Sequence, residues 1–362
     1  MTAVIAAGCF FLGRKMENKA LSAVFQAEQE LNIRLNRSDL EGLGNIEGPI
    51  YITGHKSPDS DTVCSSIAYA ELLRKLGYDA QAVVLGPVNP ETAFILDSAG
   101  VDVPPLLEDA SGENMILIDH SEYIQSAEGL KDAHIISIID HHGDGSVTTG
   151  NQMIYDARPL GATATIVWMR YRNYGLIPDP QTAKVMMGAL LSDTSNLRAN
   201  TTFADREALR VLSGLAGVSD TDAFYQEMFK ASLSYEGMTD EEIFFSDYRE
   251  YESAGIRYSI GCVQVYDEAE ASDMAERMKA VLPGALSSAG MDLAFAQINI
   301  FHDDLSITYI VPSGEQAAAV IEAAFGDKAI FDGTAYNFNP GMGRKATLVP
   351  AITDVLASHP SE

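Results

Sequence analysis

The sequence predicts an α/β protein of two domains, because short β-rich runs alternate with amphipathic helical windows from residue 50 onward. Its length of 362 residues also fits two domains, at roughly 150 residues for each. A hydrophobic fraction of 46% can fill two cores, and a charged fraction of 21% is ordinary for a folded chain. Intrinsic disorder and a disulfide-rich scaffold are therefore excluded.

The first domain is expected to contain a mostly parallel sheet flanked by helices. Its first helix is predicted over residues 62–76, where Val63, Ile67 and Ala70 recur at helical spacing and Gly77 supplies a stop. The other elements predicted here are strands at 50–53, 82–85, 115–118 and 135–139, and helices at 162–174 and 181–191.

The order of elements changes in the last third of the chain, which predicts a second and smaller α/β unit. A window rich in Gly, Ser and Asp at 214–222 separates it from the first domain. Its predicted strands are 257–265, 293–300 and 306–311, and its predicted helices are 271–281 and 315–325. The expected division is an N-terminal extension at 1–49, a first domain at 50–216, a linker region at 217–234 and a second domain at 235–362.

The N-terminal extension contains a helical window at 20–35, with Val24, Ala27 and Leu31 on one face. This face is either a partner surface or the inner side of a covering helix. An apolar run at 3–12 is short for an export signal, and no basic residue precedes it. We therefore expect no export of the chain.

The charge balance limits the possible partners. The chain carries 24 Lys and Arg against 51 Asp and Glu, a formal net charge of −27. Such a charge repels nucleic-acid backbones and anionic membrane surfaces, so neither is an expected partner. Its three cysteines, Cys9, Cys64 and Cys262, are far apart and fit free thiols, which favours a reducing cytoplasmic location.

Candidate metal ligands gather where predicted elements end. Three of them follow the strand at 50–53, one closes the strand at 115–118, three close the strand at 135–139, and one ends the helix at 181–191. In open α/β sheets, the carboxyl ends of the strands meet at one edge and form the binding site. The candidates are His55, Asp59, Asp61, Asp119, Asp140, His141, His142 and Asp193.

A mixture of imidazole and carboxylate groups suits Mn²⁺, Co²⁺, Fe²⁺ or Zn²⁺, whereas an all-oxygen site would favour Mg²⁺ or Ca²⁺. The candidates suffice for two ions, and a pair roughly 3.5–4 Å apart is the usual apparatus for in-line attack on phosphorus. The alternatives are that a strand-end aspartate only caps the next helix, or that Asp140 orients a neighbouring histidine. The joint arrangement favours a dinuclear metal site.

Four segments together resemble the motifs of the DHH phosphoesterase superfamily. They are Gly-His-Lys-Ser-Pro-Asp-Ser-Asp at 54–61, Ile-Asp-His at 118–120, Ile-Asp-His-His at 139–142 and Ser-Asp at 192–193. In the second domain, Gly-Arg-Lys-Ala-Thr-Leu-Val-Pro at 343–350 is similar to the Ser-Arg-Lys-Lys-Gln-Val-Val-Pro signature of family II, manganese-dependent inorganic pyrophosphatases. Gly-Ala-Thr-Ala-Thr-Ile at 161–166 also looks like that family's Gly-Cys-Thr-Ala-Thr-Ile. The resemblance covers about residues 50–356.

The resemblance implies an N-terminal DHH domain that binds metal, a C-terminal DHHA2-type domain that binds substrate, and an active site in the cleft between them. His55 and Asp59 would bind one metal ion, and Asp61, His141 and Asp193 the other, while Asp119 bridges both. Two Mn²⁺ ions, with Co²⁺ possible, would hold the hydroxide that attacks pyrophosphate, and additional Mg²⁺ or Mn²⁺ would arrive with the substrate.

The resemblance also implies catalytic roles for His142, Asp119 and Asp140, with His142 contacting the phosphate and protonating the leaving group. Arg249, Arg344 and Lys345 would bind the phosphate far from the metals, because a guanidinium fork and an ammonium recognise phosphate by charge. A homodimer through the N-terminal domain is the expected assembly.

The chain departs from the family pattern at five positions. They are Ser57 and Ser121, where the family has Asn, Arg249 and Ala346, where it has Lys, and Thr347, where it has Gln. A phosphate clamp with one cationic side chain fewer could shift the substrate preference. The alternatives are therefore another DHH phosphoesterase, acting on short polyphosphate, a nucleotide or an oligonucleotide, and a non-catalytic metal-dependent phosphate sensor.

Overall fold

The computed structural model describes residues 2–42, 46–143, 145–302 and 305–358 and divides into two compact units, Met1–Ser232 and Leu233–Glu362. Each unit has its own sheet and its own hydrophobic core. Among the described residues, no helix combines the length and the apolarity that a membrane crossing requires. The division of the chain into domains of separate function stays a prediction.

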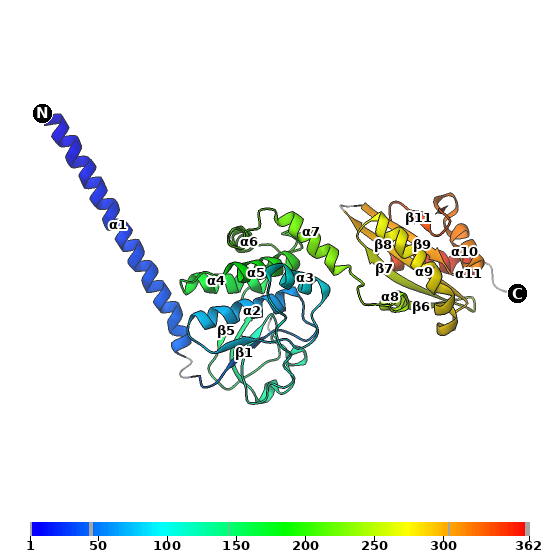
Figure 1. Ribbon diagram of the computed structural model, residues 1–362, viewed down its shortest axis with the longest axis horizontal. Coiled ribbons are helices and arrows are strands. Elements are labelled where there is room, and N and C mark those ends of the chain that lie inside the picture. Colours follow the sequence, from blue (N-terminus) through cyan, green and yellow to red (C-terminus); the bar gives the residue numbers. More distant parts are fainter. Residues whose placement is uncertain (1, 43–45, 144, 303–304, 359–362) are drawn as a thin grey trace. The chain divides into compact units, whose positions relative to one another are not determined.

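The first unit is built on a five-stranded sheet in the order β2-β1-β3-β4-β5 (Figure 1). All recorded strand pairs are parallel, so the carboxyl ends of the strands lie at one edge. The strands are β1 (Ile50–Thr53), β2 (Ala80–Ala82), β3 (Asn114–Ile118), β4 (His134–Asp140) and β5 (Ile154–Ala157). The predicted fold class, a mostly parallel sheet flanked by helices, is confirmed for this unit.

Helices cover one face of this sheet, and the larger core lies between these helices and the sheet (Figure 1). They are α2 (Ser60–Lys75), α3 (Pro90–Ala99), α4 (Thr163–Asn173), α5 (Pro180–Asp193), α6 (Phe203–Ala216) and α7 (Thr221–Ser232). A smaller core, which includes Met115, Leu117 and Ile138, lies on the other face with the short helices η1 (Tyr123–Gln125) and η2 (Leu130–Asp132). Successive side chains of a strand point to opposite faces of the sheet. Because β3 and β4 are almost continuously apolar, both faces of the sheet are apolar.

The N-terminal helix α1 (Thr2–Glu41) contacts the unit near its end. Leu40 is buried, and the Arg37 guanidinium donates two hydrogen bonds, of 2.7 and 3.2 Å, to the Tyr174 carbonyl oxygen. The predicted helical window at 20–35 falls inside α1, but Val24 and Leu31 on its predicted face are at least half exposed. The predicted face of this window is therefore exposed, whereas Ile33 in the same window lies against Gly175.

Residues 221–232 form helix α7, although the sequence predicts a linker region at 217–234. The Phe224 ring of α7 lies 5.7 Å from the Phe94 ring of α3, and Met228 is fully buried. The Gly- and Asp-rich composition instead marks a turn between helices: Gly217 ends α6 with φ 70°, and the Asp220 carboxylate accepts from the Ala223 amide. A turn and a linker share this composition, so composition could not distinguish them.

The second unit contains a six-stranded sheet in the order β10-β11-β9-β8-β7-β6. β7 and β8 pair in parallel, and the other recorded pairs are antiparallel. The strands are β6 (Tyr248–Ser253), β7 (Ile256–Val265), β8 (Leu293–His302), β9 (Leu305–Pro312), β10 (Ile330–Phe331) and β11 (Tyr336–Phe338). This is the predicted smaller α/β unit.

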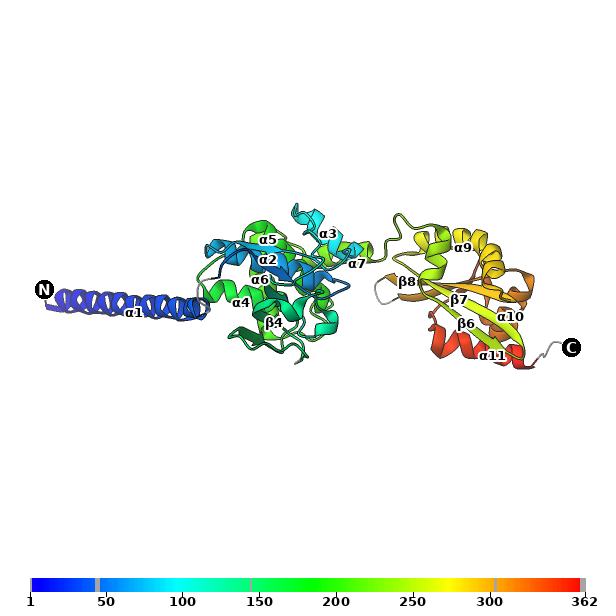
Figure 2. The ribbon, with the colours of Figure 1, turned by 90° about the horizontal axis from the view of Figure 1, so that it is seen from below.

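Helices lie on both faces of this second sheet (Figure 2). α8 (Asp240–Ser246) and α9 (Glu268–Ala289) cover one face, and α10 (Glu315–Phe325) and α11 (Val349–Ser358) cover the other. The short helix η3 (Gly326–Lys328) follows α10, and the π-helical turn η4 (Arg344–Leu348) leads directly into α11. The two predicted basic residues of the 343–350 segment therefore lie on a turn that the buried Leu348 anchors to the core.

The described cysteines are free and buried, as predicted for Cys64 and Cys262. The side chain of Cys9 lies outside the described residues. Burial raises the pKa of the Cys262 thiol to about 11, so near pH 8 the reactive thiolate is scarce. In a Cys9→Ser variant, we expect both remaining thiols to react slowly with a disulfide reagent near pH 8 and rapidly once guanidinium chloride unfolds the chain. Rapid reaction of the native protein would contradict this burial.

Candidate metal centre

The turn between β1 and α2 places two of the predicted ligands side by side. Asp59 is the N-cap of α2, where its Oδ1 accepts from the Thr62 amide at 2.9 Å. Its other oxygen, Oδ2, lies 3.3 Å from His55 Nε2. Ser57, between them, has a φ of 56°. Asn adopts this conformation more readily than Ser does, and Asn is the residue that the resembled family has at this position.

Asp119 directly follows β3 and is buried. Its φ of 65° is a left-handed conformation that aspartate tolerates better than most residues. Thr62 Oγ1 donates to Oδ2 and Thr163 Oγ1 donates to Oδ1, each at 2.9 Å. The carboxylate is therefore held between the first turns of α2 and α4.

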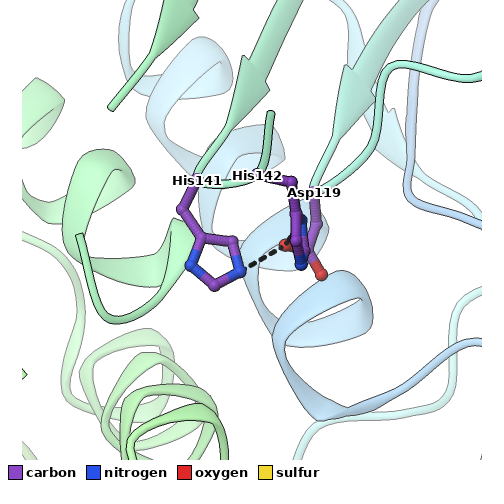
Figure 3. Close-up of side chains that lie close together, drawn as sticks. All are labelled: Asp119, His141 and His142. Atoms are coloured by element: carbon purple, nitrogen blue, oxygen red, sulfur yellow. Dashed lines mark ion pairs between the residues drawn. The ribbon is translucent and has the colours of Figure 1, made fainter. Parts of the chain in front are cut away.

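The two oxygens of Asp119 face different imidazole rings. Oδ2 lies 3.7 Å from His55 Nε2, whereas Oδ1 lies 3.4 Å from His141 Nε2 and 3.7 Å from His142 Nδ1. Figure 3 shows His141 and His142 converging on this carboxylate from the end of β4. One carboxylate with a separate nitrogen ligand beside each oxygen has the geometry needed to bridge two ions.

His141 presents a lone pair to the site. Its Nδ1 lies 3.1 Å from the Leu160 carbonyl oxygen, to which a protonated Nδ1 donates. Its Nε2 is buried without a hydrogen-bond partner among the described residues, although Asp193 Oδ2 lies 3.3 Å away. A buried imidazole nitrogen that faces carboxylates, while the other nitrogen donates to a backbone carbonyl, is the usual arrangement of a metal ligand.

Asp61 is fully buried at the first turn of α2. Its Oδ2 accepts from the Thr163 amide at 2.6 Å, and its Oδ1 accepts from the Ala164 amide at 2.9 Å and from Ser65 Oγ at 2.8 Å. The two amides begin α4, so the positive end of that helix faces the carboxylate.

The clustered carboxylates favour a bound cation. Burial, and then the repulsion of neighbouring carboxylates, raises the pKa of Asp119 and of Asp193. Divalent ions would remove this cost, and imidazole mixed with carboxylate suits Mn²⁺. The residues fit two such ions, because they form two groups. Within each group, the ligand atoms all lie within 4.8 Å of one another. The first group is His55, Asp59 and Asp119, and the second is Asp61, Asp119, His141 and Asp193.

Asp140 is in none of the candidate ligand groups found among the described residues. Its Oδ1 accepts from the His142 amide at 3.0 Å and lies 3.0 Å from His142 Nδ1. The Asp140 hydrogen bond is the main cause that raises the pKa of His142, whose ring is 57% exposed. The geometry therefore matches the alternative in which Asp140 orients a neighbouring histidine.

The second unit carries the three predicted phosphate-binding residues. Arg344 Nη1 donates to the Asp247 carbonyl oxygen and Nη2 donates to Asp247 Oδ1, both at 2.8 Å. Arg249 and Lys345 are exposed, and no carboxylate pairs with either among the residues that the structure describes. Burial raises the pKa of the Cys262 thiol, and the positive charges of Arg344 and Arg249 both lower it. Both arginines therefore lie near Cys262. The structure therefore brings Arg249 and Arg344 to the same part of the unit.

Sequence reasoning missed the threonines that hold the central carboxylate. Thr62 and Thr163 both donate to Asp119, yet they are far apart in the sequence. The one available signal was that Thr163 lies in the quoted segment at 161–166 and Thr62 follows the segment at 54–61. Neither position could be linked to Asp119 without the fold.

Gly54 leaves room for Thr62, which gives a testable expectation. A Cβ at residue 54 would lie 2.2 Å from Thr62 Cγ2 and 2.8 Å from Thr62 Cβ, so Gly54→Ala must displace this threonine. Overpacking of this kind costs about 1–3 kcal/mol. We expect a lower melting temperature and weaker Mn²⁺ binding, measured by calorimetry. Gly214→Ala, where a Cβ meets open space, is the control and should lower neither quantity.

Comparisons with known proteins agree on one family. Residues 49–190 match the DHH family, N-terminal domain, and residues 226–355 match the DHHA2 domain. A protein of Exiguobacterium sp. strain AT1b, named a probable manganese-dependent inorganic pyrophosphatase, is 35% identical over 84% of this chain and 98% of its own length. The manganese-dependent inorganic pyrophosphatase of Methanothrix thermoacetophila is 32% identical over 84% of this chain and 97% of its own.

A solved structure agrees with these relatives. The crystal structure of a Methanococcus jannaschii protein assigned to the family II inorganic pyrophosphatases shares 33% identity, with a TM-score of 0.51. It covers 84% of this chain and 99% of that one. The paired ligand groups, the two matched domains and these relatives lead to one assignment: the chain belongs to family II, the manganese-dependent inorganic pyrophosphatases of the DHH superfamily.

Proposed function

We propose that this protein hydrolyses inorganic pyrophosphate to two phosphates. The observation that carries the proposal is the placement of Asp119, whose two oxygens face His55 and His141 in two separate ligand groups. Two cations on either side of one carboxylate suit attack on phosphorus. The substrate comes from the relatives, which are named inorganic pyrophosphatases.

His55, Asp59 and Asp119 would hold one Mn²⁺ ion, and Asp61, Asp119, His141 and Asp193 the other. When bound, two such ions supply a water of lowered pKa as nucleophile and neutralise the charge that develops on the phosphoryl group. Co²⁺ has similar ligand preferences and could replace Mn²⁺, and additional Mg²⁺ or Mn²⁺ would arrive with the substrate. Thr62 and Thr163 keep the Asp119 carboxylate in place during the reaction.

His142 would act on the leaving phosphate. Its exposed ring belongs to a third candidate ligand group, with Asp119 and His141, and Asp140 favours its protonated form. The proton on Nε2 would pass to the bridging oxygen as the phosphorus–oxygen bond breaks, so that the leaving group departs as a protonated phosphate. Asp140 holds the other nitrogen and so directs Nε2 outward.

Arg344, Lys345 and Arg249 would bind the phosphate far from the metal ions. The contact of Arg344 with Asp247 fixes its guanidinium before substrate arrives. Lys345 offers a point charge, and Arg249 a planar fork where the family has lysine. Ala346 and Thr347, both exposed on the same turn, add no charge to this set.

Phosphate release by the metal-stripped protein reloaded with Mn²⁺ tests the proposal, with pyrophosphate, tripolyphosphate and a short dinucleotide compared side by side. We expect a large preference for pyrophosphate. Preference for tripolyphosphate or the dinucleotide would make the protein another DHH phosphoesterase. Tight Mn²⁺ binding without any turnover would make it a phosphate sensor.

We also propose a cytoplasmic homodimer formed through the N-terminal domain. β5 is an edge strand of the first sheet. An edge strand offers unpaired backbone groups to a second copy of the chain. Light scattering coupled to size-exclusion chromatography would show twice the mass of the 39.0 kDa chain.

A further inference from the structure

Glu91 contacts both serines that lie next to the candidate ligands, although it belongs to neither ligand group. Ser60 Oγ donates to Glu91 Oε1 at 2.7 Å, and Ser192 Oγ donates to the same oxygen. Ser60 separates Asp59 from Asp61 at the start of α2, and Ser192 precedes Asp193 at the end of α5. One carboxylate thus connects the two helix ends that carry three of the ligands.

The position of Glu91 is itself fixed by α3. Asn89 caps this helix by accepting from the Thr92 amide at 2.8 Å. Thr92 is fully buried, and its Oγ1 lies 3.0 Å from Ser60 Oγ. Gly188 of α5 is so close to α3 that a Cβ there would lie 2.7 Å from Ile95 Cγ2. The Glu91 carboxylate therefore contacts the serines from a helix that packs directly against α5.

We propose that Glu91 is a positioning residue for the metal centre. By holding Ser60 and Ser192 on one oxygen, it sets the separation between the start of α2 and the end of α5, and so between Asp61 and Asp193. Its negative charge also favours cations in the neighbouring groups. The inference rests on the proposed function only in that both require the same two ions. Among the described residues, Glu91 is in none of the candidate ligand groups.

In the sequence, Glu91 has a simpler explanation, so the residue is not recognisable there as part of the metal centre. An acidic residue in the first turn of a helix is common, because it interacts favourably with the helix dipole. Only the fold brings residues 60, 91 and 192 together.

Mn²⁺ affinity of the metal-stripped protein tests the proposal, measured by equilibrium dialysis for wild type, Glu91→Ala and Glu91→Gln. We expect Glu91→Ala to weaken binding about 10- to 100-fold, as is usual when a partner of metal ligands is removed. Glu91→Gln keeps an acceptor oxygen and should recover part of the loss. Asp97→Asn, an exposed acid on the same helix, is the control and should bind as wild type does.

Double-mutant cycles that combine Glu91→Ala with Ser60→Ala or Ser192→Ala show whether the effect of Glu91 on Mn²⁺ affinity depends on these hydroxyls. If it does, the serine substitutions weaken Mn²⁺ binding in wild type but add little in Glu91→Ala. At saturating Mn²⁺, the KM for pyrophosphate should stay unchanged in Glu91→Ala, because the proposed role of Glu91 is to position the metal ligands and not to bind the substrate.

Unchanged Mn²⁺ affinity in Glu91→Ala, with a lower melting temperature of the metal-free protein, would reduce Glu91 to a structural residue and overturn the proposal. A wild-type protein that binds two Mn²⁺ ions yet leaves pyrophosphate intact would overturn the proposed function instead. The role of Glu91 would survive that result.

Discussion

Asp119→Ala is expected to abolish turnover and metal retention together. Among the described residues, Asp119 is the one member common to the group of His55 and Asp59 and the group of Asp61, His141 and Asp193. Its removal leaves Thr62 and Thr163 without their acceptor. Loss of a single electrostatic stabiliser typically lowers kcat by about 10²–10³-fold, and here both ions depend on it. We expect a fall in kcat of at least about 10³-fold, measured as phosphate release with excess Mn²⁺, and Mn²⁺ stoichiometry well below that of wild type.

The control for Asp119→Ala is Asp102→Ala, because Asp102 is an exposed acid in the same unit. It should retain the activity and the metal content of wild type. An Asp119→Ala protein that folds normally and still holds two Mn²⁺ ions would show that Asp119 does not bridge the site. Circular dichroism of both variants excludes general unfolding as the cause.

Lys345→Ala is expected to raise the KM for pyrophosphate strongly, by about 10- to 100-fold, while the metal content stays unchanged. Lys345 lies in the second unit, exposed and without a carboxylate partner among the described residues, so its charge is available to an anion. Charge-assisted contacts to phosphate are among the strong hydrogen bonds, and the proposed contact of Lys345 would be made to the bound substrate as well as to the transition state. Steady-state kinetics at saturating Mn²⁺ give both constants.

Lys328→Ala, at another exposed lysine of the same unit, provides the comparison and should leave KM unchanged. A mild change of equal size in KM and in kcat for Lys345→Ala would argue against a role in binding phosphate. Lys345→Arg should recover only part of the affinity, because a planar fork does not replace a point charge at the same position.

The sequence could predict which candidate ligands lie together, because their positions depend on local order. Asp119 directly follows the buried apolar run of β3, and His141 follows the apolar run of β4 after Asp140; parallel strands bring such ends together. The strand at 50–53 and the helix at 315–325 match β1 and α10 residue for residue, since a turn signal or a glycine bounds each.

The remaining structure depends on contacts between distant residues. The predicted strand at 82–85 is β2 at Ala80–Ala82, because Val84 leaves the sheet to form a bridge with Leu106. The donors to Asp119 come from two helices about 100 residues apart, and no local pattern marks them. The departure at Arg249 could be seen in the sequence, but its proximity to Arg344 could not.

The two oxygens of Asp59 have separate partners. One oxygen starts helix α2 by accepting from the Thr62 amide, and the other faces His55. Asparagine or serine would start the helix as well as aspartate does, since any of them offers one acceptor. Folding alone therefore tolerates several residues here, and only the second oxygen requires a carboxylate. An Asp59→Asn variant would therefore keep its fold while losing a candidate metal ligand.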